Sequence, residues 1–183
     1  MSTNPSPFRW SVEAYEHVVA LGGFSPDKRI ELIEGELIEI MPQNPPHATT
    51  IELAEEACRV ILLSGFRVRV QLPLRFTTSV PEPDIAVVQG GLRSFSSAHP
   101  TTAVLIIEVS DTTLEYDQTI KAGIYAAVGI EDYWVLNINE RTVEVRRQPG
   151  PSGYRSLQTF TEADTVAPLF NPTASVKVAD LLP

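Results

Sequence analysis

Two acidic residues of this 183-residue chain stand at the ends of apolar segments, where a carboxylate is costly to place. Asp84 opens the apolar part of PEPDIAVV (81–88), and Glu108 follows five consecutive apolar residues in AVLIIEVSD (103–111). An ionised carboxylate beside a buried strand must be solvated, paired with a base or bound to a cation. If the two strands are neighbours, Asp84 and Glu108 form a site of hard oxygen ligands suited to Mg²⁺.

Each acid also has an interpretation that involves no metal site. Glu108 can lie just past the buried part of its strand, in water or against an arginine, and Pro83-Asp84 is common turn chemistry. A cation held between the two acids would lower the pKa of bound water and neutralise charge on a phosphoryl group. The two residues alone leave both interpretations open.

The composition limits the classes of function. A net charge of −9 and a sequence pI near 4.8 argue against a protein that coats nucleic acid by charge alone. Local contacts with DNA remain compatible with this charge, because the 14 basic residues are clustered: three lie in the segment 66–76 and three more in the segment 141–147.

Length and composition predict one globular domain over residues 1–183, since 43% of the chain is hydrophobic. The single cysteine, Cys58, has no partner for an internal disulfide, which predicts a cytoplasmic location. The N-terminal segment lacks the pattern of a signal peptide, and no apolar run is long enough for a membrane span. We therefore expect no membrane partner.

The N-terminal half of the chain predicts two helices and a hairpin. A helix should run from Ser11 to about residue 21, and RIELIEGELIEIM (29–41) reads as a hairpin that turns at Glu34-Gly35. Pro45-Pro46 should break the chain, and Thr49 and Glu52 fit a capping box for a helix over 50–63. Cys58 falls on the apolar face of that helix.

Strands dominate the second half. FRVRVQLPLRF (66–76) alternates apolar and polar residues, as a half-exposed strand does, and further strands are expected at 84–88, 104–109, 133–138 and 142–148. A helix over 115–128 separates two of them, so these two are candidates for parallel neighbours. Because no side of residues 103–107 is polar, this strand should be central and covered on both faces. The fold class is α/β, with an α+β variant left open.

The motifs in this order resemble the PD-(D/E)XK nuclease superfamily, through Pro-Asp at 83–84 and Glu-Val-Ser at 108–110. Two longer segments are also similar to a large bacterial family of restriction-endonuclease-like proteins formerly catalogued as a domain of unknown function. These segments are ELIEGELIEIMPQNPPH (31–47) and EVSDTTLEYDQTIKAGIYAAVGIEDYWVLNINERTVEVRR (108–147). The resemblance extends over roughly residues 9–147.

This resemblance implies a mixed β-sheet core flanked by helices, with an N-terminal helix and hairpin. It implies a metal-dependent endonuclease that hydrolyses phosphodiester bonds of DNA, with Asp84 and Glu108 binding Mg²⁺ and with Mn²⁺ as a substitute. The superfamily's lysine stands two positions after the glutamate, where this chain has Ser110. Lys121, on the following helix, takes the place of that lysine. A homodimer is also implied, with its contact in the strand 66–76 or in YWVLNI (133–138).

Four further residues are supporting candidates. Glu34 at the hairpin turn is a possible additional acid, and His47 before the second helix is placed to orient a water or a phosphate. Asp117 and Lys121 are four residues apart and share a helix face, and Tyr125 is one turn further on. The alternative interpretations are a turn residue, a surface histidine, an exposed ion pair of little energetic weight and a packing tyrosine.

A second function stays open from the sequence. Ser110 in place of the motif lysine, together with the net charge of −9, is compatible with a catalytically inactive member of the fold that serves as a binding or assembly module. The two functions differ in a structural requirement. An enzyme needs Asp84, Glu108 and Lys121 in one cleft, whereas a binding module does not.

Overall fold

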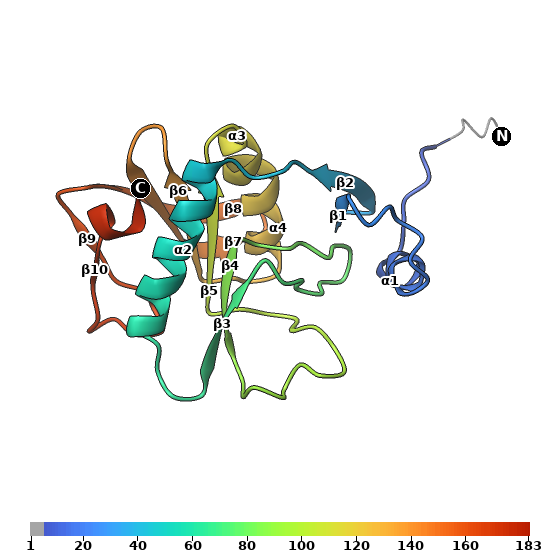
Figure 1. Cartoon of the computed structure of the whole chain (residues 1–183), viewed down its shortest axis with the longest axis horizontal. Coiled ribbons are helices and arrows are strands. Elements are labelled where there is room, and N and C mark those ends of the chain that lie inside the picture. Colours follow the sequence, from blue (N-terminus) through green and yellow to red (C-terminus); the bar gives the residue numbers. More distant parts are fainter. Residues whose placement is uncertain (1–5) are drawn as a thin grey trace.

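A six-stranded mixed sheet forms the centre of the computed structural model, which describes residues 6–183 (Figure 1). The strand order is β3-β4-β5-β6-β7-β8, and only the pair β5–β6 is parallel. The α/β prediction is therefore confirmed, with a mixed sheet. The strands are β3 (Phe66–Val70), β4 (Ile85–Gln89), β5 (Leu105–Ser110), β6 (Asp132–Asn137), β7 (Thr142–Gly150) and β8 (Gly153–Thr161).

Strand β5 is the interior strand that the apolar run predicted. All six of its residues are buried, and Leu105 and Ile106 are fully inaccessible to solvent. It pairs with β4 on one side and with β6 on the other, so it has no free edge. The predicted parallel pairing of the two strands that flank the 115–128 helix is confirmed. Glu108 thus belongs to the most buried strand of the sheet.

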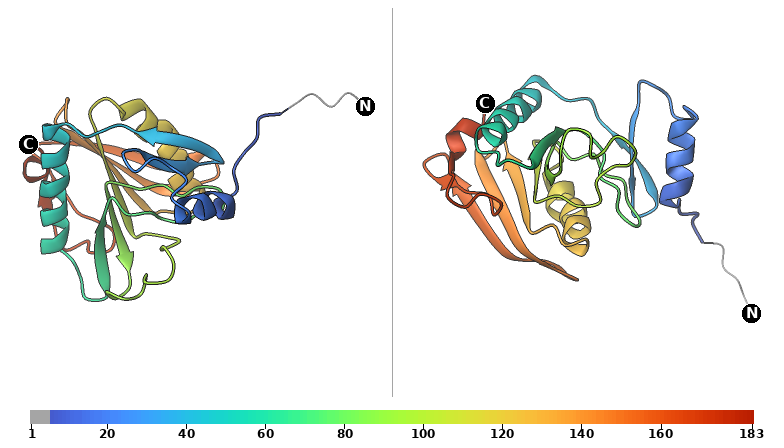
Figure 2. Two further views of the ribbon diagram at one scale, coloured as in Figure 1. Left: turned by 45° about the vertical axis from the view of Figure 1, so that its right-hand side comes forward. Right: turned by 90° about the horizontal axis from the view of Figure 1, so that it is seen from below.

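Helices cover the two faces of the sheet (Figure 2). On one face, α2 (Pro45–Val60) packs against β3, β4 and β5, and its Ile51, Ala54 and Cys58 join the apolar cluster there, which confirms the buried position predicted for the cysteine. The other face is covered by the segment α3 (Leu114–Tyr116), η1 (Asp117–Lys121) and α4 (Ala122–Ala127). Because side chains alternate along β5, Ile107 and Val109 face α2, while Ile106 and Glu108 face η1 and α4.

The N-terminal elements form a separate layer beside the second face (Figures 1 and 2). Helix α1 (Val12–Ala20) is capped by Ser11, and β1 (Arg29–Ile33) pairs with β2 (Glu36–Ile40) in the predicted hairpin. Glu34 and Gly35 both have positive φ, as a tight two-residue turn requires. Leu32 bridges to Val80 and is fully buried, which attaches the hairpin to the segment before β4.

The C-terminal segment returns to the α2 side of the sheet (Figure 1). It contains β9 (Thr165–Val166), β10 (Val176–Lys177) and the 3₁₀ helix η2 (Val178–Leu181). Its apolar side chains join the cluster around α2. Among residues 6–183, no helix has both the length and the apolar character needed to cross a bilayer.

The predicted start of α2 was wrong. The helix begins at Pro45 rather than near residue 50, and Asn44 caps it by accepting a hydrogen bond from the backbone N–H of His47 (3.0 Å). Pro45-Pro46 does not break the chain, because proline has no N–H and the first helical positions need none. The Thr49–Glu52 capping box is therefore not formed, and His47 lies in the first helical turn.

Two other predicted elements differ from the structure. The strand expected over 66–76 ends at Val70, because Gln71 adopts a positive φ of 51° and Pro73 follows. The predicted apolar face is buried at Val68, Leu74 and Phe76, whereas Leu72 of the same face is 44% exposed. The helix expected over 115–128 is continuous in direction but is interrupted by η1, a π-helical turn.

The buried position of β5 gives a stability prediction. Ile106→Ala should lower the free energy of unfolding by about 2–5 kcal/mol, because the surrounding side chains cannot collapse fully into the cavity. Leu92→Ala is the matched control, since Leu92 is 82% exposed, and it should change stability by less than about 0.5 kcal/mol. Urea denaturation measures both variants, and equal costs for the two would contradict the central position of β5.

Candidate active site

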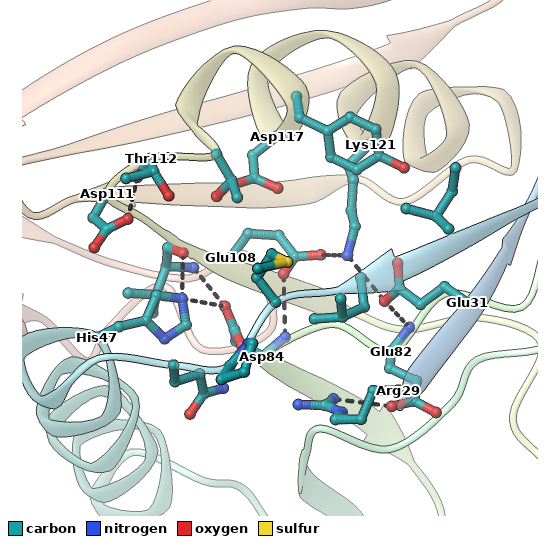
Figure 3. A pocket seen from close by; sticks show the side chains of 18 of the residues that line it. Arg29, Glu31, His47, Glu82, Asp84, Glu108, Asp111, Thr112, Asp117 and Lys121 are labelled. Atoms are coloured by element: carbon teal, nitrogen blue, oxygen red, sulfur yellow. Dashed lines mark hydrogen bonds and ion pairs between the residues drawn. The ribbon is translucent and has the colours of Figure 1, made fainter. Parts of the chain in front are cut away.

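One pocket of about 280 Å³ collects residues from several elements near the end of β5 (Figure 3). The hairpin β1–β2 and the segment that leads into α2 form one side of this pocket. The start of β4, the end of β5, the residues after it, and η1 form the other side. Asp84, Glu108, Lys121, His47 and Asp117 all line it, so the structure brings together five of the seven candidate residues.

Asp84 and Glu108 are adjacent because of the strand register. Ile85 pairs with Ile107, which places the preceding Asp84 beside Glu108. The backbone N–H of Asp84 donates to Glu108 Oε2 (3.2 Å), and the N–H of Val109 donates to Asp84 Oδ2 (2.9 Å). Each acid therefore accepts a hydrogen bond from the other strand's backbone, which fixes both carboxylates at the end of the β4–β5 pair.

Lys121 reaches the same place from η1. Its Nζ donates to Glu108 Oε1 and to Glu31 Oε1, each at 3.1 Å, and its side chain is 6% exposed (Figure 3). Tyr125, one turn later, donates its hydroxyl to Glu108 Oε1 (2.6 Å). Asp84, Glu108 and Lys121 thus meet the geometric requirement for an enzyme, while their catalytic roles remain a prediction.

Ser110, at the position of the superfamily's lysine, is a structural partner of Asp117. Its hydroxyl donates to Asp117 Oδ2 (2.7 Å), and Thr113 donates to the same oxygen (2.7 Å). Asp117 is 4% exposed, so the interpretation of Asp117 and Lys121 as an exposed surface pair is wrong. The serine binds the first residue of η1, and the last residue of η1, Lys121, supplies the ammonium.

Burial and the close approach of several carboxylates set the pKa values of the ionisable groups in the pocket. Burial raises the pKa of Glu108 to about 8; Lys121 opposes this rise, and the carboxylates of Asp84, Asp117 and Glu31 add to it. Burial alone would lower the pKa of Lys121, but Glu108 and Glu31 outweigh it and raise that pKa, so the ammonium keeps its proton. Burial also raises the pKa of Asp117. The single ammonium of Lys121 therefore neutralises several acids only in part, and the pocket carries an excess of negative charge.

Glu31 is the site residue that the sequence analysis missed. Glu34, which was proposed as a further acid, is exposed at the hairpin turn and does not line the pocket. Glu31 is 1% exposed and accepts from the backbone N–H of Glu82 (2.7 Å) as well as from Lys121. The signal was present in RIELI, an acid inside an apolar strand, which is the same signal that identified Glu108.

His47 lies closer to the acids than a surface histidine would. Its Nε2 is 2.8 Å from the carbonyl oxygen of Val109 and 3.7 Å from Asp84 Oδ2. This position follows from the earlier start of α2, because the first turn of the helix points its side chains at the end of β5. The predicted placement of His47 near the reacting groups is therefore compatible with the geometry.

The pair Asp84 and Glu108 has the chemistry to hold one divalent cation. Both are hard oxygen donors, they lie side by side, and the excess of carboxylates around Lys121 leaves negative charge to neutralise. Within residues 6–183, however, no group of three or more His, Cys, Asp or Glu side chains forms a preset ligand cluster. Mg²⁺ typically takes one or two carboxylates and keeps waters, so two suffice.

The pocket wall is acidic beyond its centre. Glu39, Glu82 and Asp111 also line it, and Arg29, the other basic residue of the wall besides Lys121, is paired with Glu82 (2.9 Å). The arginines of 66–76 were candidates for contacts with DNA. In the structure Arg75 binds Glu13 and Glu16, and Arg69 lies over the ring of Phe95. Their charges are therefore partly engaged within the protein.

Comparison with known proteins agrees with this fold. The family model Uma2, described as "Putative restriction endonuclease", matches residues 12–179, and the chain belongs to this family. The fold resembles the crystal structure of a "putative nuclease belonging to DUF820" from Anabaena variabilis, with a TM-score of 0.69 and 19% identity over 94% of this chain and 97% of that one. No curated protein matches the chain. The predicted restriction-endonuclease-like fold is confirmed.

The position of Lys121 gives a prediction for the metal-free protein. Lys121→Met should lower the free energy of unfolding by about 3–5 kcal/mol, because it leaves Glu31 and Glu108 buried without their cation. Arg141→Met is the control, since Arg141 pairs with Glu162 at the surface and should cost less than about 1 kcal/mol. Urea denaturation compares them. Adding Glu108→Gln to Lys121→Met should recover part of the loss, and no recovery would contradict this charge balance.

Proposed function

We propose that this chain is a metal-dependent endonuclease that hydrolyses phosphodiester bonds of DNA, with Mg²⁺ as its cofactor and Mn²⁺ as a substitute. The observation that carries the proposal is the meeting of Asp84, Glu108 and Lys121 at the end of β5. Membership of a family described as "Putative restriction endonuclease" supports the reaction class. The family description assigns no roles to individual residues, so the roles given below are part of the proposal.

Asp84 and Glu108 would hold the cation, which when bound supplies positive charge to the phosphate and makes bound water more acidic. The chain's residues prepare this site before any ligand arrives. The backbone of β4 and β5 orients both acids, and Tyr125 fixes Glu108 Oε1. Because these donors are already in place, binding requires little reorganisation, and preorganised charge is what stabilises a transition state.

Lys121 would stabilise the charge that builds on the phosphoryl oxygens. Its Nζ uses two hydrogen bonds, to Glu31 and Glu108, and an ammonium carries three N–H groups. The third is available to a phosphate oxygen or to the attacking water. His47 and Asp117 would act as supporting groups, the first beside Asp84 and the second by holding the turn that carries Lys121.

A second candidate function, a binding or assembly module without catalysis, is favoured by the charge. The pocket wall and the chain as a whole are acidic, and both repel a polyanion. A divalent cation reduces this repulsion only at the centre of the site. Both candidate functions allow the cation to bind, so only an assay of DNA cleavage distinguishes the nuclease from the binding module.

Metal binding tests the first part of the proposal. Mg²⁺ or Mn²⁺ at about 100 times Kd should raise the Tm by about 5–10 °C, because the ion binds only the folded chain. Asp84→Asn and Glu108→Gln should abolish this rise, while leaving the metal-free Tm near or above the native value, since each removes one of several repelling acids. Glu52→Gln, at an exposed position of α2, should keep the full rise. A full rise in Asp84→Asn would exclude it as a ligand.

Cleavage of supercoiled DNA completes the test. The native chain should nick the plasmid with Mg²⁺ or Mn²⁺ and not in EDTA. Lys121→Met should keep the metal-induced rise in Tm but cut at least about 10²-fold more slowly, as expected when a group that stabilises the transition state is lost. Metal binding by the native chain without any cleavage would favour the binding module.

A homodimer is proposed from the family resemblance. Of the two predicted contact regions, β6 lies inside the sheet with every residue buried, so it offers no contact. Strand β3 is an edge strand and remains the candidate. Sedimentation at micromolar concentration should show twice the 20.1 kDa chain mass, and Val68→Pro should return it to one chain, because proline removes an N–H from the ladder. A native monomer would refute the dimer.

A further inference from the structure

One oxygen of Glu31 has no use in the fold. Glu31 Oε1 accepts from Lys121 and from the N–H of Glu82, whereas Oε2 is buried without a hydrogen-bond partner. Among residues 6–183, it is the one fully buried carboxylate oxygen in this condition. A buried charged oxygen without a partner costs free energy. We therefore expect a hydrogen-bond donor that is not part of the protein to bind at Oε2.

The contacts that hold the fold together do not use the second oxygen of Glu31. The two contacts that tie β1 to Lys121 and to the segment before β4 both end on Oε1. An amide oxygen would accept the same two hydrogen bonds without burying a charge. The charge of Glu31 helps to keep the buried Lys121 protonated, but the second oxygen takes no part in that contact and is left for a ligand of the pocket that Glu31 lines (Figure 3).

The neighbours of Glu31 decide what kind of donor fits. Lys121 Nζ lies between Glu31 and Glu108, so a second cation would stand against an ammonium that is already there. A phosphate oxygen is excluded next to the carboxylate by like charge. A water molecule satisfies both conditions, since it donates to Oε2 and can accept the third N–H of Lys121.

We propose that Glu31 binds the attacking water through Oε2 and takes its proton during hydrolysis. This inference rests on the proposed nuclease function. The water oxygen forms a bond to phosphorus, and the bond from phosphorus to the leaving ester oxygen breaks. The water's proton passes to Glu31 and from there to solvent, and the leaving oxygen takes a proton from another water. Glu31 is thus a catalytic residue beside the cation ligands rather than one of them.

The unpaired Oε2 of Glu31 also has a purely structural explanation, which predicts different results for the variants. The hydroxyl of Tyr116 is also buried without a partner and lines the same pocket. A small shift that joins this hydroxyl to Glu31 Oε2 would make the pair a packing contact. In that case Tyr116→Phe would leave Oε2 unpaired again and would reproduce the stability change of Glu31→Gln, and neither variant would affect the chemical step selectively.

The experiment compares Glu31→Gln, Glu31→Ala, Tyr116→Phe and a control, Glu36→Gln, which removes an exposed acid of the same hairpin that does not line the pocket. Each is measured for Tm without metal, for the rise in Tm with Mn²⁺, and for single-turnover nicking of plasmid DNA. Glu31→Gln should keep the Mn²⁺-induced rise and lose about 10²-fold or more in rate, the range for a general base. Glu36→Gln should stay within about threefold of the native rate.

Chemical rescue separates a catalytic carboxylate from a structural one. Sodium formate should raise the rate of Glu31→Ala at least about fivefold, because formate fits the space left by the side chain, and it should not rescue Lys121→Met. If Glu31→Ala fails to fold, the rate of Glu31→Gln decides. The inference is overturned if Glu31→Gln cuts at the native rate, if it loses the Mn²⁺-induced rise, or if Tyr116→Phe reproduces all its effects. If the native chain binds Mn²⁺ but cuts nothing, the nuclease proposal itself fails and Glu31 loses this role with it.

Discussion

The buried ammonium of Lys121 is the interaction on which the arrangement of the site depends. It joins Glu31 of the N-terminal hairpin to Glu108 of the central strand, so three elements far apart in the sequence meet at one charge. Without this cation two carboxylates would be buried unpaired, a situation that proteins rarely tolerate. The hairpin therefore belongs to the site, although it pairs with no strand of the six-stranded sheet.

Patterns that follow from burial were predictable from the sequence. The unbroken apolar run 103–107 gave the interior strand, and the helix between two apolar strands gave their parallel pairing. The meeting of Asp84, Glu108 and Lys121 was predicted through the family resemblance rather than from spacing. Glu31 was missed because the hairpin was treated as a local turn, which drew attention to Glu34. Only the packing of the hairpin on the segment before β4 shows that Glu31 points inward.

Unusual backbone conformations account for the other features of the site that the sequence did not predict. The helix start at Pro45 uses two prolines where the pattern suggested a break, and it turns His47 toward Asp84. The π-helical turn Asp117–Lys121 leaves no clear mark in the sequence, yet it buries both of its end residues. Such turns occur often at functional sites. Here the wider turn lets Asp117 bind Ser110 while Lys121 reaches Glu108, so a serine at the position of the motif lysine remains compatible with a complete site.

The charge of the pocket constrains how any phosphodiester can enter it. Glu31, Asp84, Glu108 and Asp117 surround one ammonium, and the carboxylates at the wall have a single arginine among them. A divalent cation at Asp84 and Glu108 would offset only part of this excess. Under the proposed function, DNA would approach only after the cation is bound, since without it the phosphate would meet like charge at short range and in a low dielectric. Under the proposed function, binding of nucleic acid and binding of metal would therefore be coupled: each would strengthen the other, by the reciprocity that links two ligands of one protein.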